Sequence, residues 1–349
     1  MLLFLGYTGW NEADPERTCG SCHEIVPSLE SWQLSAHRDI SCAGCHGTAL
    51  STGWHSLTER AGMVLTHWRG DPAPGTVKLE EAQVLEVMQE CIRCHQDEYK
   101  RWTSGGHSAT YADIFLNEDH NRMERLYPDC FRCHGMYYDG TIGDLVEPIS
   151  TSGPWQLKDP EKGGDPVIPC LACHPVHMEN PVRVRPASMD DPDAIFYERE
   201  RREEFPGLYL RADQIHLRAG DLPRPEMMSG GRQVSFSPDP VQRVCVQCHA
   251  PDWKHQAGSE DDRTPAGVHE GLSCRACHQD HSNDARASCR TCHPAISNCG
   301  LDVENMNTTF RDRWSENDIH FVSCADCHLD GVPGRSLDGA PRRSRLHGR

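Results

Sequence analysis

The sequence predicts a mainly α-helical chain with extensive coil and little or no β-sheet. No run of residues shows the sustained alternation of apolar and polar side chains that is typical of a half-buried strand. Phe, Trp and Tyr together make up only 7% of the 349 residues, so the side chains that usually build a core are scarce. The chain instead carries 19 cysteines and 21 histidines. Its fold must therefore be organised in part by something other than apolar burial.

The cysteines follow one repeated pattern. Cys-x-x-Cys-His occurs nine times and uses eighteen of the nineteen cysteines, leaving only Cys299. The motif cysteines are Cys19, Cys22, Cys42, Cys45, Cys91, Cys94, Cys130, Cys133, Cys170, Cys173, Cys245, Cys248, Cys274, Cys277, Cys289, Cys292, Cys324 and Cys327. The histidines that close the motifs are His23, His46, His95, His134, His174, His249, His278, His293 and His328.

The spacing of the motif points to one chemistry. Two thiols two residues apart can add to the two vinyl groups on one edge of a haem, and the next His then lies under the ring and offers its imidazole to the iron. Zinc also binds Cys-x-x-Cys, but it does not need a His directly after every second Cys, and a disulfide scaffold imposes no such triplet. The motifs therefore predict nine covalently bound haems c, with the motif histidines as proximal iron ligands. The chain is then a haem-organised, nonahaem c-type cytochrome, in which porphyrin faces replace much of the missing core.

Twelve histidines lie outside the motifs, more than the nine that full bis-histidine ligation needs. His37, His269 and His320 lie just before a motif. His177 and His281 follow a proximal His by three residues, so we expect them to bind a neighbouring haem rather than the same iron. The distal iron ligand candidates are His37, His55, His67, His107, His120, His177, His216, His255, His269, His281 and His320.

Other features leave alternatives for these distal positions. Six of the eight tryptophans lie beside spare histidines, a pattern that fits either ligation by the His or packing of the Trp on a porphyrin face. His347 lies in the tail and is not a candidate. Methionine is a rarer, potential-raising ligand, so Met63, Met178 or Met306 is the alternative to one of the histidines.

The motifs fall into three groups. Residues 1–75 form an N-terminal di-haem module, 76–185 a tri-haem module, and 241–349 a tetra-haem module with a basic C-terminal tail. Between the last two lies a haem-free linker or insertion, 186–240, rich in Pro and charged residues. The gaps between motifs vary too much for a solenoid repeat.

Three helices are predicted outside the motifs. Apolar spacing predicts a helix over 77–90, which leads into the third motif, and a second over about 107–126. Within the linker, 194–205 is bounded by Pro192 and Pro206 and predicts a short exposed helix. This helix is either a solvated spacer or a docking surface.

Charge and hydropathy exclude two classes of protein. With 35 basic and 52 acidic residues the net charge is −17, which argues against nucleic acid as a partner. No window approaches the roughly 18–20 apolar residues of a membrane span, which excludes a polytopic membrane protein. The first residues, MLLFLGYTG, are apolar but short, and we expect them to end a longer signal or a truncated membrane anchor. Haem c is attached outside the cytoplasm in bacteria and archaea, so we expect export to a periplasmic or extracellular face.

Two parts of the chain resemble known families. LGYTGWNEADPERTCGSCHEIVPSLESWQLSAHRDISCAGCHG, within residues 1–75, resembles the start of the NapC/NirT-type membrane-anchored quinol dehydrogenases, although Ile25 stands at the position of their ligating Met. EYKRWTSGGH, GVHEGLSCRACHQDH and NDIHFVSCADCH resemble the multihaem cytochromes of the nitrification and nitrite-reduction group. The resemblance implies closely packed haems that pass electrons along a chain, and, in a few members, one open haem where a small nitrogen or sulfur oxyanion reacts.

The residues favour an electron-transfer protein with no catalytic residue of its own. It would pass electrons from a membrane or periplasmic donor, such as a quinol-oxidising complex, to a periplasmic or extracellular redox partner. We expect it to act as a subunit of a larger complex or filament, with a homo- or hetero-oligomer as a further form. The alternative is an oxidoreductase with one open haem that reduces or oxidises a small nitrogen or sulfur oxyanion. Tyr137, Tyr138 and Arg132 are the positional suggestions for its proton and anion chemistry. Cys299 is interpreted as a buried thiol, with an iron ligand or an intermolecular bridge as alternatives.

Overall fold

The computed structural model describes most of the middle of the chain and parts of both ends. Its described residues are 6, 9, 17, 20–47, 61–62, 64–65, 67–70, 80–176, 206–224, 226, 228–229, 231–249, 263–282, 285, 292, 307–308, 315 and 318–323. About 48% of the described structure is helical and 8% is strand, which confirms the predicted mainly α fold with extensive coil. None of the helices within these residues is long and apolar enough to cross a membrane. The predicted helix over 194–205 lies outside the described residues.

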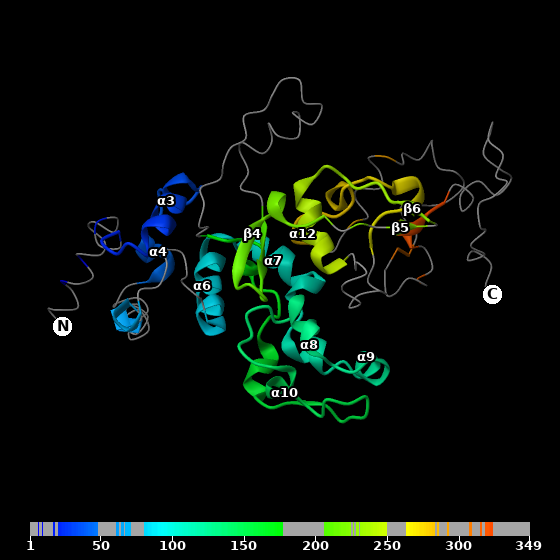
Figure 1. The fold of residues 1–349 in the computed structure, drawn as a ribbon, viewed down its shortest axis with the longest axis horizontal. Coiled ribbons are helices and arrows are strands. Elements are labelled where there is room, and N and C mark those ends of the chain that lie inside the picture. Colours follow the sequence, from blue (N-terminus) through cyan, green and yellow to red (C-terminus); the bar gives the residue numbers. More distant parts are fainter. Residues whose placement is uncertain are drawn as a thin grey trace, which may run out of the picture. The chain divides into compact units, whose positions relative to one another are not determined.

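The chain divides into two compact units (Figure 1). The first unit comprises residues 1–100 and 107–217, and the second comprises 101–106 and 218–349. The predicted division into di-, tri- and tetra-haem modules stays a prediction. Sheet structure in the described residues is limited to three two-stranded sheets, β1–β2, β3–β4 and β5–β6.

The elements of the first unit are mostly short helices, with 3-10 helices written η. Its helices are α3 (Val26–Leu34), α4 (Cys42–His46), α6 (Glu81–Cys94), most of α7 (Gln96–Thr103), most of η1 (Gly106–Ser108), α8 (Tyr111–Phe115), α9 (Glu118–Met123), η2 (Pro128–Arg132), α10 (Ile142–Leu145), η3 (Pro160–Gly164) and η4 (Cys170–Ala172). Its strands are β1 (Val146–Glu147), β2 (Gln156–Leu157), β3 (Gly207–Leu210) and most of β4 (Ile215–Arg218).

The helix predicted over 77–90 is confirmed as α6, which begins at Glu81 and runs on into the third motif. Glu80 caps it, with the Gln83 side chain accepting from the Glu80 backbone N–H at 3.0 Å. Val84 and Met88, four residues apart, are buried, as the apolar spacing predicts. Both cysteines of the third motif therefore lie on the last turn of a rigid helix.

The continuous helix predicted over 107–126 was wrong, because the chain forms η1, α8 and α9 there instead. Thr110 caps α8, and the Asn117 side chain accepts from the His120 backbone N–H at 3.1 Å to begin α9. Asn and Thr side chains that bond nearby backbone groups compete with helix continuation and favour a new N-terminus. Asn121 fixes the break by donating from Nδ2 to the Phe115 carbonyl at 2.9 Å.

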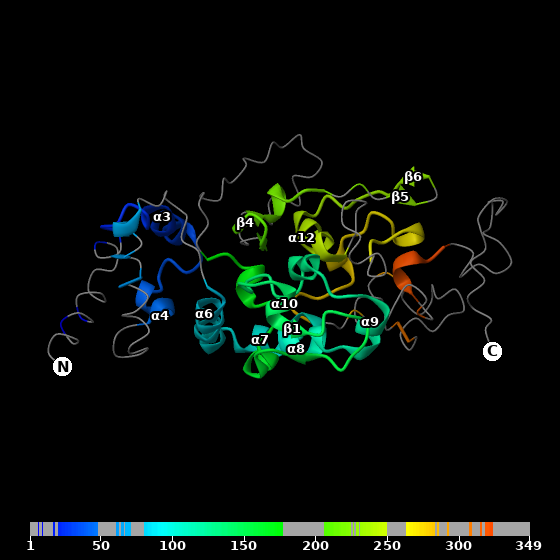
Figure 2. The same ribbon diagram turned by 60° about the horizontal axis from the view of Figure 1, so that its bottom comes forward.

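An aromatic core holds the lower part of the first unit together, where α8, α10 and β1 lie side by side (Figure 2). The ring of Phe131 lies 5.6 Å from that of Phe115 and 5.1 Å from that of Tyr138. The Arg211 guanidinium covers the Phe131 ring at 4.9 Å and donates to the Tyr138 carbonyl at 3.0 Å. The buried cluster consists of Tyr111, Phe115, Leu126, Phe131, Ile142, Leu145, Val146, Leu157 and Val167. Since Phe131 lies between the cysteines of the fourth motif, this core positions that motif directly.

A polar network links α6 to the same core. Tyr111 donates from its hydroxyl to Glu81 Oε1, and burial raises the pKa of Tyr111. Lys162 Nζ lies 2.7 Å from Glu81 Oε2 and 3.3 Å from Asp165 Oδ2. The Lys162 and Glu81 side chains are only 19% and 11% exposed, and Lys162 is the cation that pairs with the Glu81 carboxylate.

We expect Lys162→Met to lower the free energy of unfolding by about 1–3 kcal/mol, because it leaves the Glu81 carboxylate without its cation. Urea denaturation of the haem-loaded protein measures this change. Lys158→Met, at an exposed lysine nearby, is the control and should change stability by less than about 0.5 kcal/mol. Adding Glu81→Gln to Lys162→Met should recover part of the lost free energy of unfolding, because no unpaired carboxylate is then left. A double variant with a lower free energy of unfolding than Lys162→Met alone would contradict this role of the pair.

Part of the predicted haem-free linker folds onto the first unit. Gly207, at the start of β3, donates from its N–H to the carbonyl of Cys173 at 2.8 Å. A Cβ at this position would meet the Leu217 carbonyl oxygen at 2.4 Å, so glycine allows the close approach of β4. Tyr209 stacks on Tyr137 at 4.2 Å between ring centres. The stretch after residue 206 thus packs against the fifth motif.

The second unit is built around one longer helix and several turns. Its elements are η5 (Ala219–Asp221), β5 (Met228–Ser229), β6 (Arg232–Gln233), α12 (Pro240–His249), η6 (Gly267–His269), η7 (Cys274–Ala276) and η9 (Ile319–Phe321). Residues 266–268 pair with 320–322 through the bond from Val268 N–H to the Val322 carbonyl at 2.9 Å. Gly267 makes this pairing feasible, because its φ is +72° and a Cβ there would lie 2.1 Å from the Val322 oxygen.

Candidate haem sites

The described Cys-x-x-Cys-His motifs share one local geometry. In the third, fourth, fifth and seventh motifs the histidine N–H donates to the carbonyl of the first cysteine at 2.8–2.9 Å. The second motif forms α4, and the sixth is the end of α12. Each motif is thus a single turn that carries both thiols and the imidazole, as attachment of one haem edge and its iron requires.

The thiols of the described motifs form no disulfides, and several of them are buried. All fourteen cysteines in the described part of the chain are free of disulfides. Burial raises the pKa of Cys91 and of Cys173 to about 11, and it also raises the pKa of Cys130 and Cys170.

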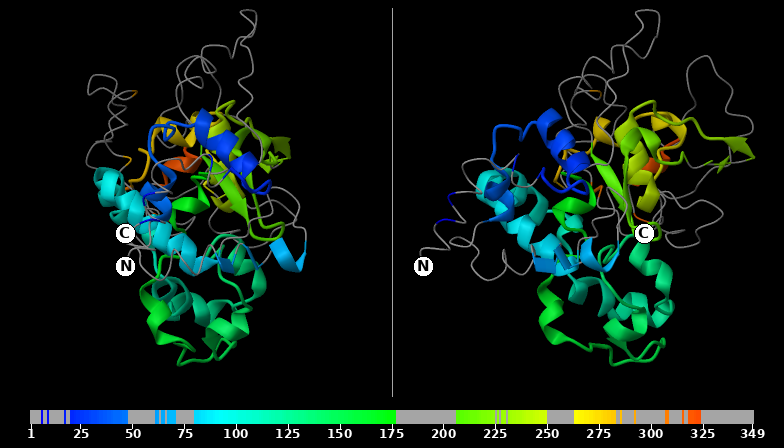
Figure 3. Two further views of the ribbon diagram at one scale, coloured as in Figure 1. Left: turned by 90° about the vertical axis from the view of Figure 1, so that its left-hand side faces the viewer. Right: turned by 60° about the vertical axis from the view of Figure 1, so that its left-hand side comes forward.

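Thiols from different motifs lie close together within each unit. In the first unit α4 packs against α6 (Figure 3), and α6 packs against η4. After burial, Cys170 of the fifth motif and then Cys45 of the second motif raise the pKa of Cys91. In the second unit α12 packs against η7, and a hydrogen bond with Cys245 lowers the pKa of Cys274. The second, third and fifth motifs are therefore neighbours in space, and so are the sixth and seventh.

The structure pairs two proximal imidazoles with candidate distal imidazoles. The ring centres of His37 and His95 are 6.1 Å apart, and those of His278 and His320 are 6.2 Å apart. Two imidazoles on opposite sides of one metal, each with a bond of about 2.0–2.1 Å, have ring centres roughly 6 Å apart. The ring-centre distances of both pairs are therefore of the size that an iron between two imidazoles requires.

A third pair lies at the first motif, where His23 and His67 have ring centres 5.5 Å apart. Glu24 lies beside both rings. Its Oε1 hydrogen-bonds with His67 Nδ1 and is 3.3 Å from His23 Nε2. Its own backbone N–H, and then His67, lower the pKa of Glu24, so the carboxylate is ionised at neutral pH. Among the described residues, these three form the one group of three or more His, Cys, Asp or Glu side chains whose ligand atoms are close enough together to bind one metal ion.

Backbone and carboxylate groups orient the distal candidates. Trp32 donates from Nε1 to the carbonyls of His37 and Ile40, at 2.9 and 3.0 Å, and so holds the loop that carries His37. This contact accounts for one of the Trp–His neighbour pairs in the sequence. Asp318 Oδ1 lies 3.0 Å from His320 Nδ1 and accepts from the His320 backbone N–H at 3.1 Å, which leaves Nε2 for a metal.

The other described candidates lie in varied surroundings. His216 Nε2 faces the Leu171 carbonyl at 2.7 Å and the Tyr137 hydroxyl at 3.0 Å, and burial lowers the pKa of His216. His269 Nδ1 faces the Ile319 carbonyl at 2.8 Å. The remaining described candidates are His107 in η1, His120 beside Asn121, and His281, whose φ is +64°. The site residues outside the described part of the chain are Cys19, Cys289, Cys324, Cys327, His55, His177, His255, His293 and His328, together with Cys299 and the alternative ligands Met63, Met178 and Met306.

The three residues suggested for an open-haem reaction take part in packing and pairing. Tyr137 is stacked on Tyr209, and Tyr138 packs against the aromatic core. Arg132 pairs with Asp129 at 3.5 Å. The three side chains therefore contribute to the packing and ion pairing of the first unit.

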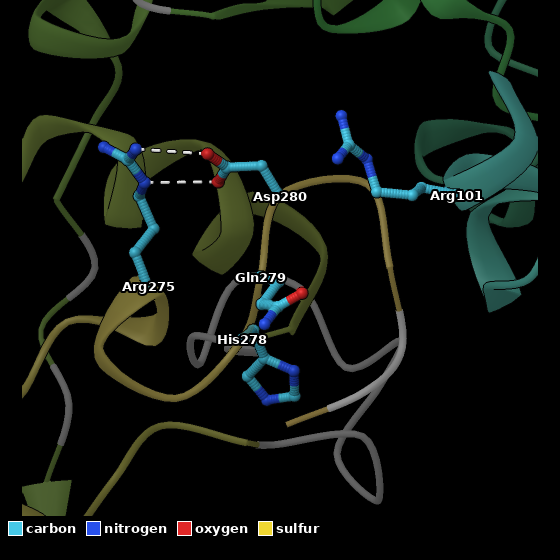
Figure 4. A pocket seen from close by; sticks show the side chains of 5 residues that line it. All are labelled: Arg101, Arg275, His278, Gln279 and Asp280. Atoms are coloured by element: carbon cyan, nitrogen blue, oxygen red, sulfur yellow. Dashed lines mark hydrogen bonds and ion pairs between the residues drawn. The ribbon is translucent and has the colours of Figure 1, made fainter. Parts of the chain in front are cut away.

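Sequence reasoning missed the charged residues that accompany the imidazoles. Glu24 directly follows His23, and Asp318 lies two residues before His320. This closeness in sequence was the signal that could have found them. A polar cavity of about 350 Å³ lies beside His278 in the second unit, lined also by Arg101, Gln279 and the pair Arg275–Asp280 (Figure 4). Arg275 donates to both Asp280 oxygens, at 3.2 and 3.1 Å.

The mainly α fold, the repeated motif turns and the paired imidazoles are features of a multihaem c-type cytochrome. The family model described as "Cytochrome c554 and c-prime" matches residues 90–149 and 224–279, about a third of the chain. The matched segments contain four of the nine motifs, the third, fourth, sixth and seventh. No curated protein and no solved structure matches the chain. The family match supports haem c as the cofactor and electron transfer through several haems as the class of function.

Proposed function

We propose that the protein transfers electrons through a chain of nine covalently bound haems c. The observation that carries this proposal is the pairing of His37 with His95 and of His278 with His320 at the spacing of two axial ligands. An iron held between two imidazoles has no open position for a substrate, and its function is then to accept and release one electron.

The neighbouring motifs supply the continuity that such a chain needs. In the first unit the third motif lies between the second and the fifth, and in the second unit the sixth adjoins the seventh. Haems attached to adjacent turns are held close together by the protein itself. The residues that perform this task are the thiols that fix each haem edge and the imidazoles that fix each ring plane.

The partners and the location form part of the same proposal. The protein is exported, and it accepts electrons at the membrane or periplasmic surface from a quinol-oxidising complex or another redox protein. It then delivers them to a periplasmic or extracellular acceptor. Its strong negative charge, −17, favours partners with basic docking surfaces.

Electron paramagnetic resonance of the oxidised protein, quantified against total haem, tests the proposal. We expect nine haems per chain by mass, only low-spin signals, and no change on adding nitrite, because every iron has two protein ligands. About one high-spin haem in nine that shifts with nitrite would contradict the proposal and favour the oxidoreductase with one open haem.

A further inference from the structure

A buried carbonyl inside the fifth motif is held by two side chains from distant parts of the chain. Leu171 lies in η4, between the two cysteines of this motif, and is 4% exposed. Tyr137 donates from its hydroxyl to the Leu171 carbonyl at 3.0 Å, and His216 Nε2 lies 2.7 Å from the same oxygen. Tyr137 follows the fourth motif, whereas His216 lies in β4, within the stretch predicted as a haem-free linker. Both segments are thus tied to the turn that carries the thiols of the fifth motif.

The positions of the hydrogens in this group follow from its donors and lone pairs. A carbonyl oxygen only accepts, and it has two lone pairs. His216 Nε2 must therefore carry the hydrogen that its 2.7 Å contact requires. The Tyr137 hydroxyl lies 3.0 Å from both the nitrogen and the oxygen, and its single hydrogen goes to the second lone pair of the oxygen. An Nε2 that carries a hydrogen has no lone pair for a metal, so this nitrogen of His216 does not bind iron.

The His216 ring is packed as well as hydrogen-bonded. Its centre lies 5.1 Å from that of the Tyr209 ring, which stacks on Tyr137 at 4.2 Å with an angle of 10° between the planes. Tyr137 and Tyr209 are each 7% exposed. Gly207, in the same sheet, donates from its N–H to the Cys173 carbonyl at 2.8 Å. The β3–β4 sheet and its aromatic stack therefore reach two carbonyls of the fifth motif.

His269, another distal candidate, has the opposite orientation. Its Nδ1 lies 2.8 Å from the Ile319 carbonyl, so Nδ1 carries the hydrogen and Nε2 keeps its lone pair. Histidines that bind a metal commonly donate from the other ring nitrogen to such a carbonyl. Without His216 and the tail residue His347, ten of the twelve histidines outside the motifs remain, which is still enough for nine irons.

From these contacts we infer that His216 is not an iron ligand but a positioning residue of the fifth haem site. Together with Tyr137 it holds the Leu171 carbonyl, and thereby the turn that carries the two thiols and the proximal imidazole. The part of the predicted linker that forms β3 and β4 then belongs to this haem site. The inference rests on the proposed function, because it needs a haem attached at the fifth motif.

Electron paramagnetic resonance of the complete haem-loaded protein tests the first half of the inference with His216→Phe. Phenylalanine keeps an aromatic ring in the stack but has neither an N–H nor a ligand atom. We expect nine haems by mass and only low-spin signals, whereas His320→Ala provides the high-spin signal that loss of a ligand produces. A high-spin haem in His216→Phe that added imidazole returns to low-spin would overturn the inference, because His216 would then bind iron through Nδ1.

A double-mutant cycle with Tyr137→Phe, measured by urea denaturation, tests the shared carbonyl. Each single variant leaves the Leu171 carbonyl one donor and should raise the equilibrium constant of unfolding by about fivefold. The double variant leaves a buried carbonyl without a donor, so its increase should exceed the product of the two single effects by about tenfold. One low-spin signal should also broaden in the double variant, because the turn that carries the proximal imidazole is no longer fixed. An increase equal to the product would overturn the inference.

Restoring the N–H separates positioning from ring packing. In His216→Gln the amide nitrogen Nε2 can take the place of the ring Nε2 as a donor. Combined with Tyr137→Phe, it should recover the stability and the sharp signal that the double phenylalanine variant loses, and no recovery would overturn the inference. Tyr209→Phe is the matched control, because it removes a hydroxyl from the same stack but no donor to Leu171. It should change the equilibrium constant of unfolding by less than about twofold.

Failure of the proposed function has a different signature. It appears in the unmodified protein, as fewer than nine haems by mass or as a haem whose signal changes with nitrite. The effects of the variants at Tyr137 and His216 are measured relative to that protein, so the two failures are distinguishable.

Discussion

Replacement of His320 by alanine is expected to convert one haem from low-spin to high-spin almost completely. His320 lies 6.2 Å from His278 between ring centres, with the two rings inclined by only 12°. The 266–268 segment also holds it, through the bond from Ala266 N–H to the His320 carbonyl at 2.7 Å. Alanine offers no donor atom, and a fixed backbone cannot bring another ligand into the gap.

Spin quantification by electron paramagnetic resonance measures this conversion. Added imidazole should restore the low-spin signal, because the freed position lies within the second unit beside a polar cavity. His347→Ala is the control: His347 lies in the C-terminal tail and is not a candidate ligand, so we expect no change in spin state. A fully low-spin His320→Ala protein would refute the pairing of His320 with the seventh motif.

Replacement of Phe131 by alanine is expected to lower the free energy of unfolding by about 3–5 kcal/mol. The Phe131 side chain is 1% exposed and contacts the Phe115 and Tyr138 rings, so truncation leaves a cavity that the rigid aromatic neighbours cannot fill. The Arg211 guanidinium also loses the ring face that it covers at 4.9 Å.

Urea denaturation of the haem-loaded protein measures the loss, and haem content by mass shows whether the fourth motif is still loaded. Met123→Ala is the matched control, since this large apolar side chain is 77% exposed and its removal should cost less than about 0.5 kcal/mol. Equal stability of the two variants would show that the aromatic cluster does not hold this motif.

Local sequence signals predicted the helices only where a single pattern dominated. The apolar spacing of Val84 and Met88 predicted α6, since nothing in that segment competes with the helix. Thr110 and Asn117 break the next predicted helix into pieces, because capping side chains outweigh a weak apolar pattern. The closeness of Trp32 to His37 in the sequence corresponds to a contact in the structure. The contact is a hydrogen bond from the Trp32 ring to the His37 backbone carbonyl.

By itself, the sequence predicted the attachment chemistry and the proximal ligands. Cys91, Cys94 and His95 lie within five residues, and a single helical turn suffices to bring their side chains to one haem edge. Only the tertiary structure decided which spare histidine meets which motif. His37 precedes its partner motif by more than fifty residues, and another motif, Cys42–His46, lies between them in the chain. Spacing along the chain says nothing about such pairs, because they depend on how separate segments pack, and the buried carboxylates beside the imidazoles depend on the same packing.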